Sequence, residues 1–247
     1  MRWFSLTLAL LHTREAEVVL GVQPETNDRV IISPQNVPHN ASRAISPSFP
    51  GFAFEEMSFC YYAADLTLRN KSNPNQVSQN LIQAITGKTQ TQPRIRVGGT
   101  SLDNSSYHPD QAEPFIIPDS QKGKGIPKNI KIGPSYFYSF ANFPQAQYVV
   151  DIPWATNDLS NSILLAKEVY KVIDASNIYA LEIGNEPNNY HGNARPSGWS
   201  MADLASQWHD WSGNISKALG FSENKKIYQA IALSSETGTT GFPGGTA

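Results

Sequence analysis

Residues 177–187 read Asn-Ile-Tyr-Ala-Leu-Glu-Ile-Gly-Asn-Glu-Pro, and this stretch decides the fold class. Its apolar part, residues 178–183, has the length and the β-branched and aromatic content of a buried strand. Gly184 ends that strand, and Pro187 cannot continue a hydrogen-bonded ladder. Asn185 and Glu186 are therefore predicted to lie where a strand ends, which is where functional side chains gather in parallel α/β barrels.

Asn185 and Glu186 have two possible roles. A carboxylic acid with an amide beside it suits a general acid that protonates a leaving oxygen. The alternative is that Glu186 is a strand-end carboxylate that is solvated or that caps the next helix. From these residues alone both interpretations stay open.

Strand-like and helix-like segments alternate along the chain. Strands are predicted over 18–21, 29–32, 52–55, 94–97, 147–152, 178–183 and 226–233. Helices are predicted over 72–87, 158–174 and 200–219, with a short one around 136–140. The first helix carries an apolar face made of Val77, Leu81, Ile82 and Ile85. A long loop from Thr100 to about Gly133 separates the strand over 94–97 from the one over 147–152.

This alternation predicts a parallel sheet with right-handed crossovers, either an open doubly wound sheet or part of a (β/α) barrel. No nucleotide fingerprint favours the open sheet. Gly123-Lys-Gly125 lacks the later glycine of a dinucleotide site, and Gly87-Lys-Thr89 lacks the upstream glycine of a phosphate loop. The five histidines have no metal-ligand spacing. We therefore expect neither a metal nor a cofactor.

The composition is that of a globular protein with a weakly charged, polar surface. The 247 residues are 40% hydrophobic and 16% charged, with a net charge of −2. There is no basic footprint for a nucleic acid partner. Asn, Ser, Pro and aromatic residues are plentiful, as in many secreted carbohydrate-active proteins. Cys60 is the single cysteine, which excludes an intrachain disulfide. Because it lies in an apolar run, we expect Cys60 to be a core residue.

The N-terminus and the sequons indicate a secreted protein. Residues 1–17 are predicted to be a signal peptide because they hold an apolar run of the right length. That run is too short to span a bilayer, so no membrane segment is expected. Four Asn-x-Ser sequons are candidate glycosylation sites: Asn40, Asn70, Asn104 and Asn214. Asn104 is favoured among them because its predicted loop is long and polar.

Three segments narrow the interpretation further. They are Arg-Val-Gly-Gly-Thr-Ser-Leu-Asp at 96–103, Gly-Asn-Glu-Pro-Asn-Asn-Tyr at 184–190 and Tyr-Gln-Ala-Ile-Ala-Leu-Ser at 228–234. Together they resemble glycoside hydrolase family 79, which holds fungal β-glucuronidases and heparanases, over roughly residues 18–235. Asn-Glu-Pro alone occurs in many barrel glycosidases, whereas Arg-Val-Gly-Gly is more specific. The resemblance implies a (β/α)8 barrel and a retaining O-glycoside hydrolase that acts on β-linked glucuronic acid in glycans.

The resemblance also implies roles for single residues. Glu186 matches the acid/base that protonates the glycosidic oxygen and then activates water. Asn185 matches the residue that contacts the sugar 2-OH. Glu55 would accept a hydrogen bond from a sugar hydroxyl, and Glu56 competes for that role because neighbouring strand residues point to opposite faces.

Further positions follow from the same matches. Gly98 and Gly99 would let the backbone approach the sugar closely. Trp154 and Tyr190 would stack on sugar faces, with packing at the barrel rim as the favoured alternative. For Asp103 a turn or loop cap is the favoured interpretation.

One departure from the family bears on activity. A retaining glycosidase needs two carboxylates about 5 Å apart, and the resemblance places its nucleophile after the seventh strand. Only five barrel strands can be counted, and Glu236 follows the fifth, so the nucleophile is expected to be absent from this chain. We expect residues 18–49 to be an N-terminal β-extension of an accessory β-sandwich with a linker, and 50–247 an incomplete barrel of about five β/α units.

Two alternatives stay beside this expectation. One is an inactive truncated product or carbohydrate-binding remnant. The other is a different barrel glycosidase, such as an arabinofuranosidase or a xylosidase. In each case the expected partner is an oligosaccharide or polysaccharide, and the sequence does not predict an oligomeric state.

Overall fold

The computed structural model describes residues 43–64, 74–222, 225, 227–229 and 233–234. The predicted signal peptide, the early strands over 18–21 and 29–32, Asn40, Asn70 and Glu236 lie outside the described residues. The chain divides into two units, Met1–Ile45 and Ser46–Ala247, and the fold below is that of the second.

Four parallel strands form the main sheet in the order β1-β2-β6-β7. They are β1 (Gly51–Glu55), β2 (Arg94–Gly98), β6 (Gln147–Ile152) and β7 (Ile178–Ile183). Tyr228 adds a parallel bridge to Leu181 of β7, where the fifth strand is predicted. Among the strands that the structure describes, those of the main sheet follow one another in chain order, without the reversal that defines a doubly wound sheet. Two arrangements were predicted, an open doubly wound sheet and part of a barrel, and this strand order favours the barrel.

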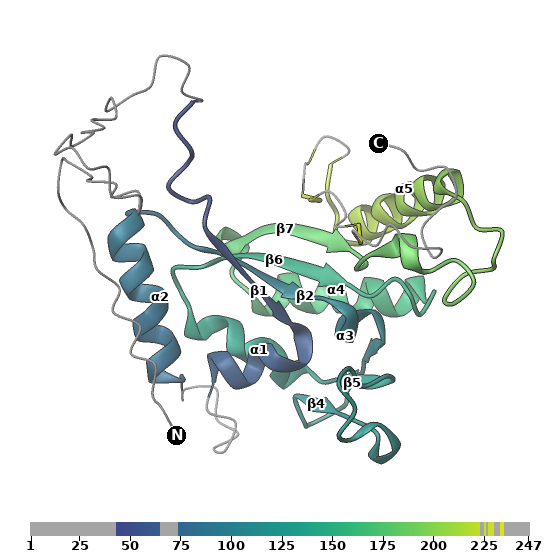
Figure 1. Cartoon of the computed structure of the whole chain (residues 1–247), viewed down its shortest axis with the longest axis horizontal. Coiled ribbons are helices and arrows are strands. Elements are labelled where there is room, and N and C mark those ends of the chain that lie inside the picture. The colour runs from purple at the N-terminus through teal and green to yellow at the C-terminus, as the bar shows by residue number, and fades with distance from the viewer. Residues whose placement is uncertain (1–42, 65–73, 223–224, 226, 230–232, 235–247) are drawn as a thin grey trace, which may run out of the picture. The chain divides into compact units, whose positions relative to one another are not determined.

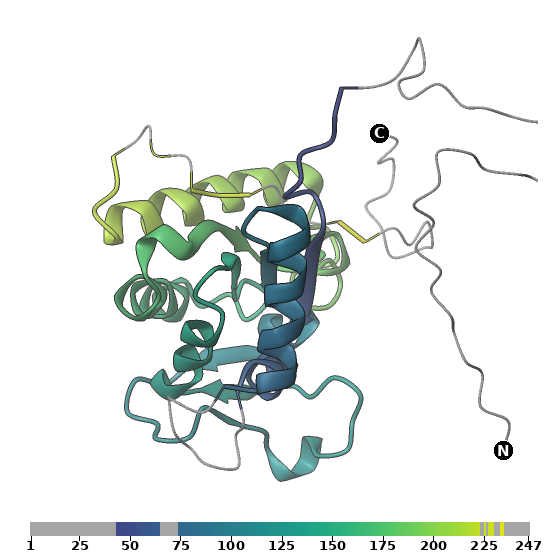
Figure 2. The same cartoon turned by 90° about the vertical axis from the view of Figure 1, so that its left-hand side faces the viewer.

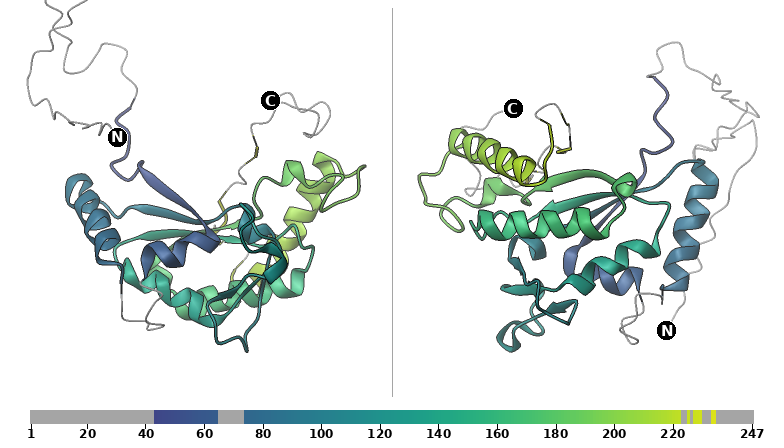
Figure 3. Two further views of the ribbon diagram at one scale, coloured as in Figure 1. Left: turned by 60° about the horizontal axis from the view of Figure 1, so that its bottom comes forward. Right: turned by 180° about the vertical axis from the view of Figure 1, so that it is seen from behind.

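Helices cover the sheet in chain order. They are α1 (Glu56–Ala63), α2 (Gln76–Thr89), η3 (Pro134–Asn142), α4 (Leu159–Val172) and α5 (Met201–Ala218). Figure 1 shows α1 and α4 on the same face of the sheet, and the two views of Figure 3 show the helices spread across it from α2 to α5. The core lies on this face, where Phe59, Tyr148 and Leu165 are almost completely buried. Cys60 is a free, buried cysteine, as expected of a core residue.

Capping side chains set the helix starts. Asp158 accepts the Asn161 N–H at the start of α4, and Ser200 forms a reciprocal capping box with Asp203 at the start of α5. The predicted starts of these two helices are confirmed. The start of α2 was predicted at residue 72, but Asn75 is its cap, because the Asn75 side chain accepts the Ser78 N–H.

The predicted apolar face of α2 needs a correction. Ile82 is buried at 3% exposure, but Val77 is 70% exposed and Leu81 is 52% exposed. Of the four predicted residues, Ile82 faces the described core, because helix spacing puts Val77 and Leu81 on a neighbouring strip of the helix surface.

The predicted loop over 100–133 contains a second, smaller sheet. Its elements are α3 (Thr100–Asp103), β3 (Ser105–Tyr107), β4 (Phe115–Ile116), η2 (Asp119–Gln121) and β5 (Ile130–Ile132). The strand order is β3-β5-β4, and Figures 1 and 2 show this sheet below the main one in both views. Strands of two or three residues are too short to show a periodicity in the sequence. No helix among the described residues is long and apolar enough to cross a membrane.

Candidate active site

The loop after β7 carries the candidate acid/base in an uncommon backbone conformation. Gly184 has a φ of 76°, and Glu186 has φ 48° and ψ 51°. A Cβ on Gly184 would lie 2.7 Å from the Tyr190 hydroxyl oxygen, so this position requires glycine. Left-handed backbone is rare for a residue with a side chain, and it persists where the surroundings hold it.

A cavity of about 380 Å³ opens at this edge of the sheet. It is lined from three sides: by α3, by the segment before β5, and by the loops after β6 and β7. The lining residues are Thr100, Asp103, Asn104, Lys128, Asn129, Ala155, Thr156, Asn185, Glu186, Asn189, Tyr190, Asn193 and Ala194. Amides and hydroxyls dominate this wall, which suits a ligand that is rich in hydroxyl groups.

Asn185 and Glu186 both line this cavity, as the sequence predicts. Glu186 is half-buried, and its Oε2 accepts a hydrogen bond from Asn189 Nδ2 at 3.4 Å. Asn185 is 9% exposed. Its Oδ1 accepts from Arg96 Nη2 at 3.1 Å, while its Nδ2 donates to Thr100 Oγ1 at 3.3 Å. The amide orientation is thereby fixed by a donor on one side and an acceptor on the other.

A buried charged layer lies beneath the cavity. Arg96 of β2 donates to both carboxylate oxygens of Glu182, at 2.7 and 3.1 Å, and to Asp151 at 3.3 Å. Both carboxylates are fully buried. Burial raises the pKa of Asp151 and the nearby Glu182 raises it further, whereas Arg96 opposes the shift. Gln229 also donates to Glu182.

Asp103 is a buried residue that caps the loop after β7, in line with the favoured interpretation, and it also lines the cavity. It is 4% exposed and faces the cavity wall from the end of α3. Its Oδ1 accepts from the Tyr190 hydroxyl at 2.5 Å, and both of its oxygens lie 3.3 Å from the Asn185 N–H. Burial raises the pKa of Asp103 to about 7, while these donors act in the opposite direction.

Neither Glu55 nor Glu56 lines the cavity. Glu55 accepts from the N–H groups of Thr100 and Ser101, at 3.2 and 2.8 Å, and from the Ser101 hydroxyl at 2.5 Å. It therefore caps the first turn of α3. Glu56 begins α1 and is 2% exposed, and neither of its carboxyl oxygens has a hydrogen-bond partner among the residues that the structure describes. Burial raises the pKa of Glu56 to about 8.

The two glycines after β2 make room for carboxylates of the protein itself. A Cβ on Gly98 would lie 2.3 Å from Asp151 Cβ, and one on Gly99 would lie 2.6 Å from Glu55 Oε1. Gly99 also has a φ of 85°. The predicted close approach to a sugar is corrected accordingly, because side chains fill the space that the glycines leave.

The aromatic pair is packed inward, in line with the alternative interpretation. Trp154 is fully buried, and its ring centroid lies 5.8 Å from that of Tyr190 and 5.9 Å from that of Trp199. Trp154 therefore has no face free for stacking on a sugar. Tyr190 is 5% exposed and stacks on Trp199, so its contribution to the cavity wall is small. Arg195 fills the centre of this cluster and donates to the Trp154 carbonyl at 2.8 Å.

The sequence reasoning missed or underrated four residues that build the site. They are Asp103, Asp151, Glu182 and Arg195. Alternation along β6 and β7 could have found Asp151 and Glu182, because each is an acidic residue in an otherwise apolar strand. Arg195 lies in an irregular loop, where no sequence pattern indicates burial.

Two sequons fall in the described part. Asn104 lines the cavity and its amide donates to the Thr100 carbonyl at 3.0 Å, so a glycan there would occupy the cavity. Asn214 is exposed on α5, where its amide donates to the Asp210 carbonyl. A glycan on Asn104, the favoured sequon, would therefore compete with a ligand for the cavity.

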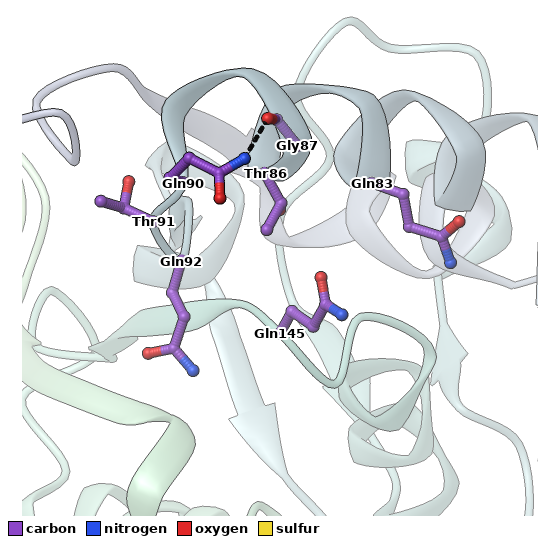
Figure 4. Close-up of a pocket in the computed structure, with 7 residues that line it drawn as sticks. All are labelled: Gln83, Thr86, Gly87, Gln90, Thr91, Gln92 and Gln145. Atoms are coloured by element: carbon purple, nitrogen blue, oxygen red, sulfur yellow. Dashed lines mark hydrogen bonds between the residues drawn. The ribbon is translucent and has the colours of Figure 1, made fainter.

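A second hollow of about 540 Å³ lies where the chain enters β2 and β6, at the amino ends of the strands. Figure 4 shows its lining of glutamines and threonines: Gln83, Thr86, Gly87, Gln90, Thr91, Gln92 and Gln145. No acid or base among the described residues lines this hollow, whereas Glu186 lines the other cavity. No group of His, Cys, Asp and Glu in the part of the chain that the structure describes could hold a metal ion.

Comparisons with known proteins show what this chain is similar to. No protein-family model matches the chain. It is 28% identical over 190 residues to a β-glucuronidase of Neurospora crassa, and 26% identical over 192 residues to one of Aspergillus niger. These alignments cover 72% and 74% of this chain but 33% and 35% of the relatives.

A solved structure shares the fold. It is that of a 4-O-α-L-rhamnosyl-β-D-glucuronidase from Fusarium oxysporum 12S, with a TM-score of 0.61 and 21% identity over 81% of this chain and 42% of that chain. The resemblance to fungal β-glucuronidases that the sequence indicates is therefore confirmed. The chain spans about a third of the length of the curated relatives it matches.

Proposed function

We propose that this chain is the acid/base-bearing part of a retaining O-glycoside hydrolase, of the family 79 type, that acts on β-linked glucuronic acid in glycans. One observation carries the proposal. Glu186 follows the fourth parallel strand and lines a polar cavity together with Asn185, in a chain that is similar to fungal β-glucuronidases. The proposal is supported by the position of Glu186 at the carboxyl end of a parallel strand, which is where barrel enzymes carry their catalytic residues.

The geometry around the pair supports a division of labour. Glu186 is half-exposed, so its carboxyl group can reach a glycosidic oxygen and later a water molecule. Asn185 is held by Arg96 so that its amide nitrogen is turned toward Thr100 and the cavity, where a sugar 2-OH could accept from it. Glu186 donates a proton to the leaving oxygen in the first step and takes one from water in the second.

The covalent step needs a second carboxylate about 5 Å from the first. Among the described residues that line the cavity, Asp103 is the other carboxylate, and donors occupy both of its oxygens. Asp103 is therefore unsuited to attack a sugar carbon. We propose that the nucleophile comes from outside the described residues.

The same observation favours a second candidate, a carbohydrate-binding protein without catalysis. A cavity with a single exposed carboxylate binds a sugar without forming a covalent intermediate. The DNA that follows codon 247 separates the two. An in-frame continuation that encodes further β/α units favours the hydrolase, and an immediate stop favours the binding protein.

The experiment is a panel of aryl glycosides offered to the product of the whole reading frame. We expect hydrolysis of 4-nitrophenyl β-D-glucuronide, with kcat/KM at least about 100-fold above the values for α-L-arabinofuranoside and β-D-xyloside, since a site built for a carboxylate rejects sugars that lack it. A preference for either of those sugars would move the protein to another class of barrel glycosidase. Binding of glucuronic acid without turnover would support the binding protein.

A further inference from the structure

Asp103 is bound to both sides of the turn that holds Glu186. The turn runs from Gly184 to Tyr190. Asp103 meets the N–H of Asn185, which precedes Glu186, and the hydroxyl of Tyr190, which ends the turn. The backbone N–H groups of Trp154 and Ala155, after β6, lie close enough to lower the pKa of Asp103. A single carboxylate thus links α3 to the loop after β7 and lies beside the loop after β6.

Every one of these partners is a hydrogen-bond donor. A carboxylate accepts on both oxygens, so it can receive the Asn185 N–H and the Tyr190 hydroxyl at the same time. An amide in its place would turn an N–H₂ group toward an N–H group of the backbone. The site is therefore specific for a carboxylate rather than for a polar side chain in general.

The conformation of Glu186 is what this arrangement controls. Glu186 holds φ 48° and ψ 51°, a strained region that a non-glycine residue leaves when nothing constrains it. Asn189 and Tyr190 donate to the carbonyls of Glu186 and Pro187, inside the turn itself. Its first residues are also held from outside, because the Gly184 N–H donates to the Ile152 carbonyl and the Asn185 side chain binds Arg96 and Thr100. Asp103 is the outside anchor that accepts the backbone N–H next to Glu186 and the hydroxyl at the end of the turn.

We propose that Asp103, acting through the Asn185 N–H and the Tyr190 hydroxyl, is a positioning residue that holds Glu186 in its left-handed conformation and so directs its carboxyl group into the cavity. The part of this inference that concerns sugar chemistry rests on the proposed function. The part that concerns the turn rests on the contacts alone. A displacement of about 1 Å at a reacting group can cost about 100-fold in rate.

The first test is amide hydrogen exchange on the full chain, followed by mass spectrometry of the peptide over residues 184–190. Asp103→Asn should speed exchange in this peptide about tenfold or more, because one charge-assisted hydrogen bond is lost and a donor faces a donor. Tyr190→Phe keeps the ring and should speed it less. Asp174→Asn removes an exposed carboxylate that accepts the Ser176 N–H before β7, and should leave the peptide unchanged.

Peptides from β6 and β7 serve as the internal reference for stability. A rise in exchange that is confined to residues 184–190 supports the positioning role. Wild-type exchange in this peptide in both Asp103→Asn and Tyr190→Phe would overturn it. If Asp103→Asn does not fold, Tyr190→Phe decides alone, because it removes a single hydroxyl.

The second test links the turn to the sugar site and uses N-bromoacetyl-β-D-glucuronosylamine as the probe. Its amide nitrogen takes the place of the glycosidic oxygen, and its electrophilic carbon lies two bonds beyond that nitrogen, on the side of the leaving group. The Glu186 carboxylate therefore displaces bromide from this carbon and forms an ester that mass spectrometry locates. Asp103→Asn should lower the limiting rate of this labelling at least about tenfold, with less than about threefold change in the half-saturating probe concentration. Labelling of Asp103→Asn at the wild-type rate would overturn the inference and leave the proposed function intact.

An unlabelled Glu186 in the wild-type protein, together with the expected exchange result, would contradict the proposed function and leave the role of Asp103 in the turn standing. The two failures are therefore distinguishable.

Discussion

Arg96 Nη2 donates to Asn185 Oδ1 at 3.1 Å while the same guanidinium binds Glu182 and Asp151. One side chain thus pairs with both carboxyl groups of the buried layer and orients the amide that lines the cavity. Stability and site geometry depend on the same residue.

The first prediction concerns this guanidinium. Arg96→Met leaves two fully buried carboxylates without their cation, so the free energy of unfolding at pH 7 should fall by about 3–5 kcal/mol. At pH 4 the loss should shrink, because protonated carboxyls need no cation. Urea unfolding at the two pH values measures this. Lys122→Met is the matched control on an exposed pair with Asp119 and should leave the midpoint unchanged. Equal loss at both pH values would contradict the charge-based account.

The second prediction concerns Glu56. Burial raises the pKa of Glu56 from its ordinary value of 4.5 to about 8 in the folded protein. Between pH 4.5 and pH 8 the folded state therefore keeps a proton that the unfolded state has lost. Stability is therefore complete below pH 4.5 and falls as pH rises toward 8. At one pKa unit per about 1.4 kcal/mol, Glu56→Gln should gain about 3 kcal/mol at pH 7 and nothing at pH 4.

Thermal unfolding across this pH range checks the Glu56 prediction, with Glu113→Gln as the control on an exposed glutamate. A variant that is less stable than the wild-type protein at pH 7 would show that the Glu56 carboxyl group has a partner that stabilises its charged form.

Sequence reasoning predicted the strands and the strand-end pair well, because these features depend on local patterns. The strands over 147–152 and 178–183 have the predicted bounds, and Asn185 and Glu186 meet at one cavity. Apolar runs bounded by glycine or proline carry that information.

The contacts of side chains with distant segments could not be predicted in the same way. The sequence cannot show that Gly98 makes room for Asp151, 53 positions later, because that contact depends on strand register. It also cannot show that Trp154 is enclosed by Tyr190 and Trp199, since strand ends expose some aromatics and bury others. The predictions that needed correction concern residues whose role depends on the segments that pack against them.

The third prediction concerns the exposed apolar residues of α2. Val77 and Leu81 are 70% and 52% exposed, so the double variant Val77→Gln, Leu81→Gln should bind less hydrophobic dye and aggregate less, with stability within about 0.5 kcal/mol of wild type. Ile82→Gln, one position away and 3% exposed, should lose about 2 kcal/mol or more. Static light scattering and dye fluorescence measure the difference. Equal destabilisation by both sets of changes would mean that Val77 and Leu81 are covered in solution.

The fourth prediction concerns secretion and glycosylation. We propose that the protein is secreted, on the basis of residues 1–17 and the four sequons. Secretory expression should give a product whose mass falls on endoglycosidase treatment. Glycopeptide mapping of the folded fraction should find Asn104 unmodified, because its side chain lines the cavity and donates to Thr100, whereas Asn214 is exposed. A folded product with a glycan on Asn104, or one without any glycan, would contradict this prediction.

The central claim is that Glu186 is the acid/base of a retaining glucuronidase. Its most direct test is Glu186→Gln in the product of the whole reading frame, assayed on an activated and an unactivated aryl β-D-glucuronide with and without azide. The change keeps shape but removes proton transfer, which is worth about 10² to 10⁴ in rate. We predict this full loss on the unactivated substrate, a smaller first-step loss on the activated one, and partial rescue by azide, which replaces the activated water. Equal loss on both substrates without any azide effect would remove Glu186 from the acid/base role.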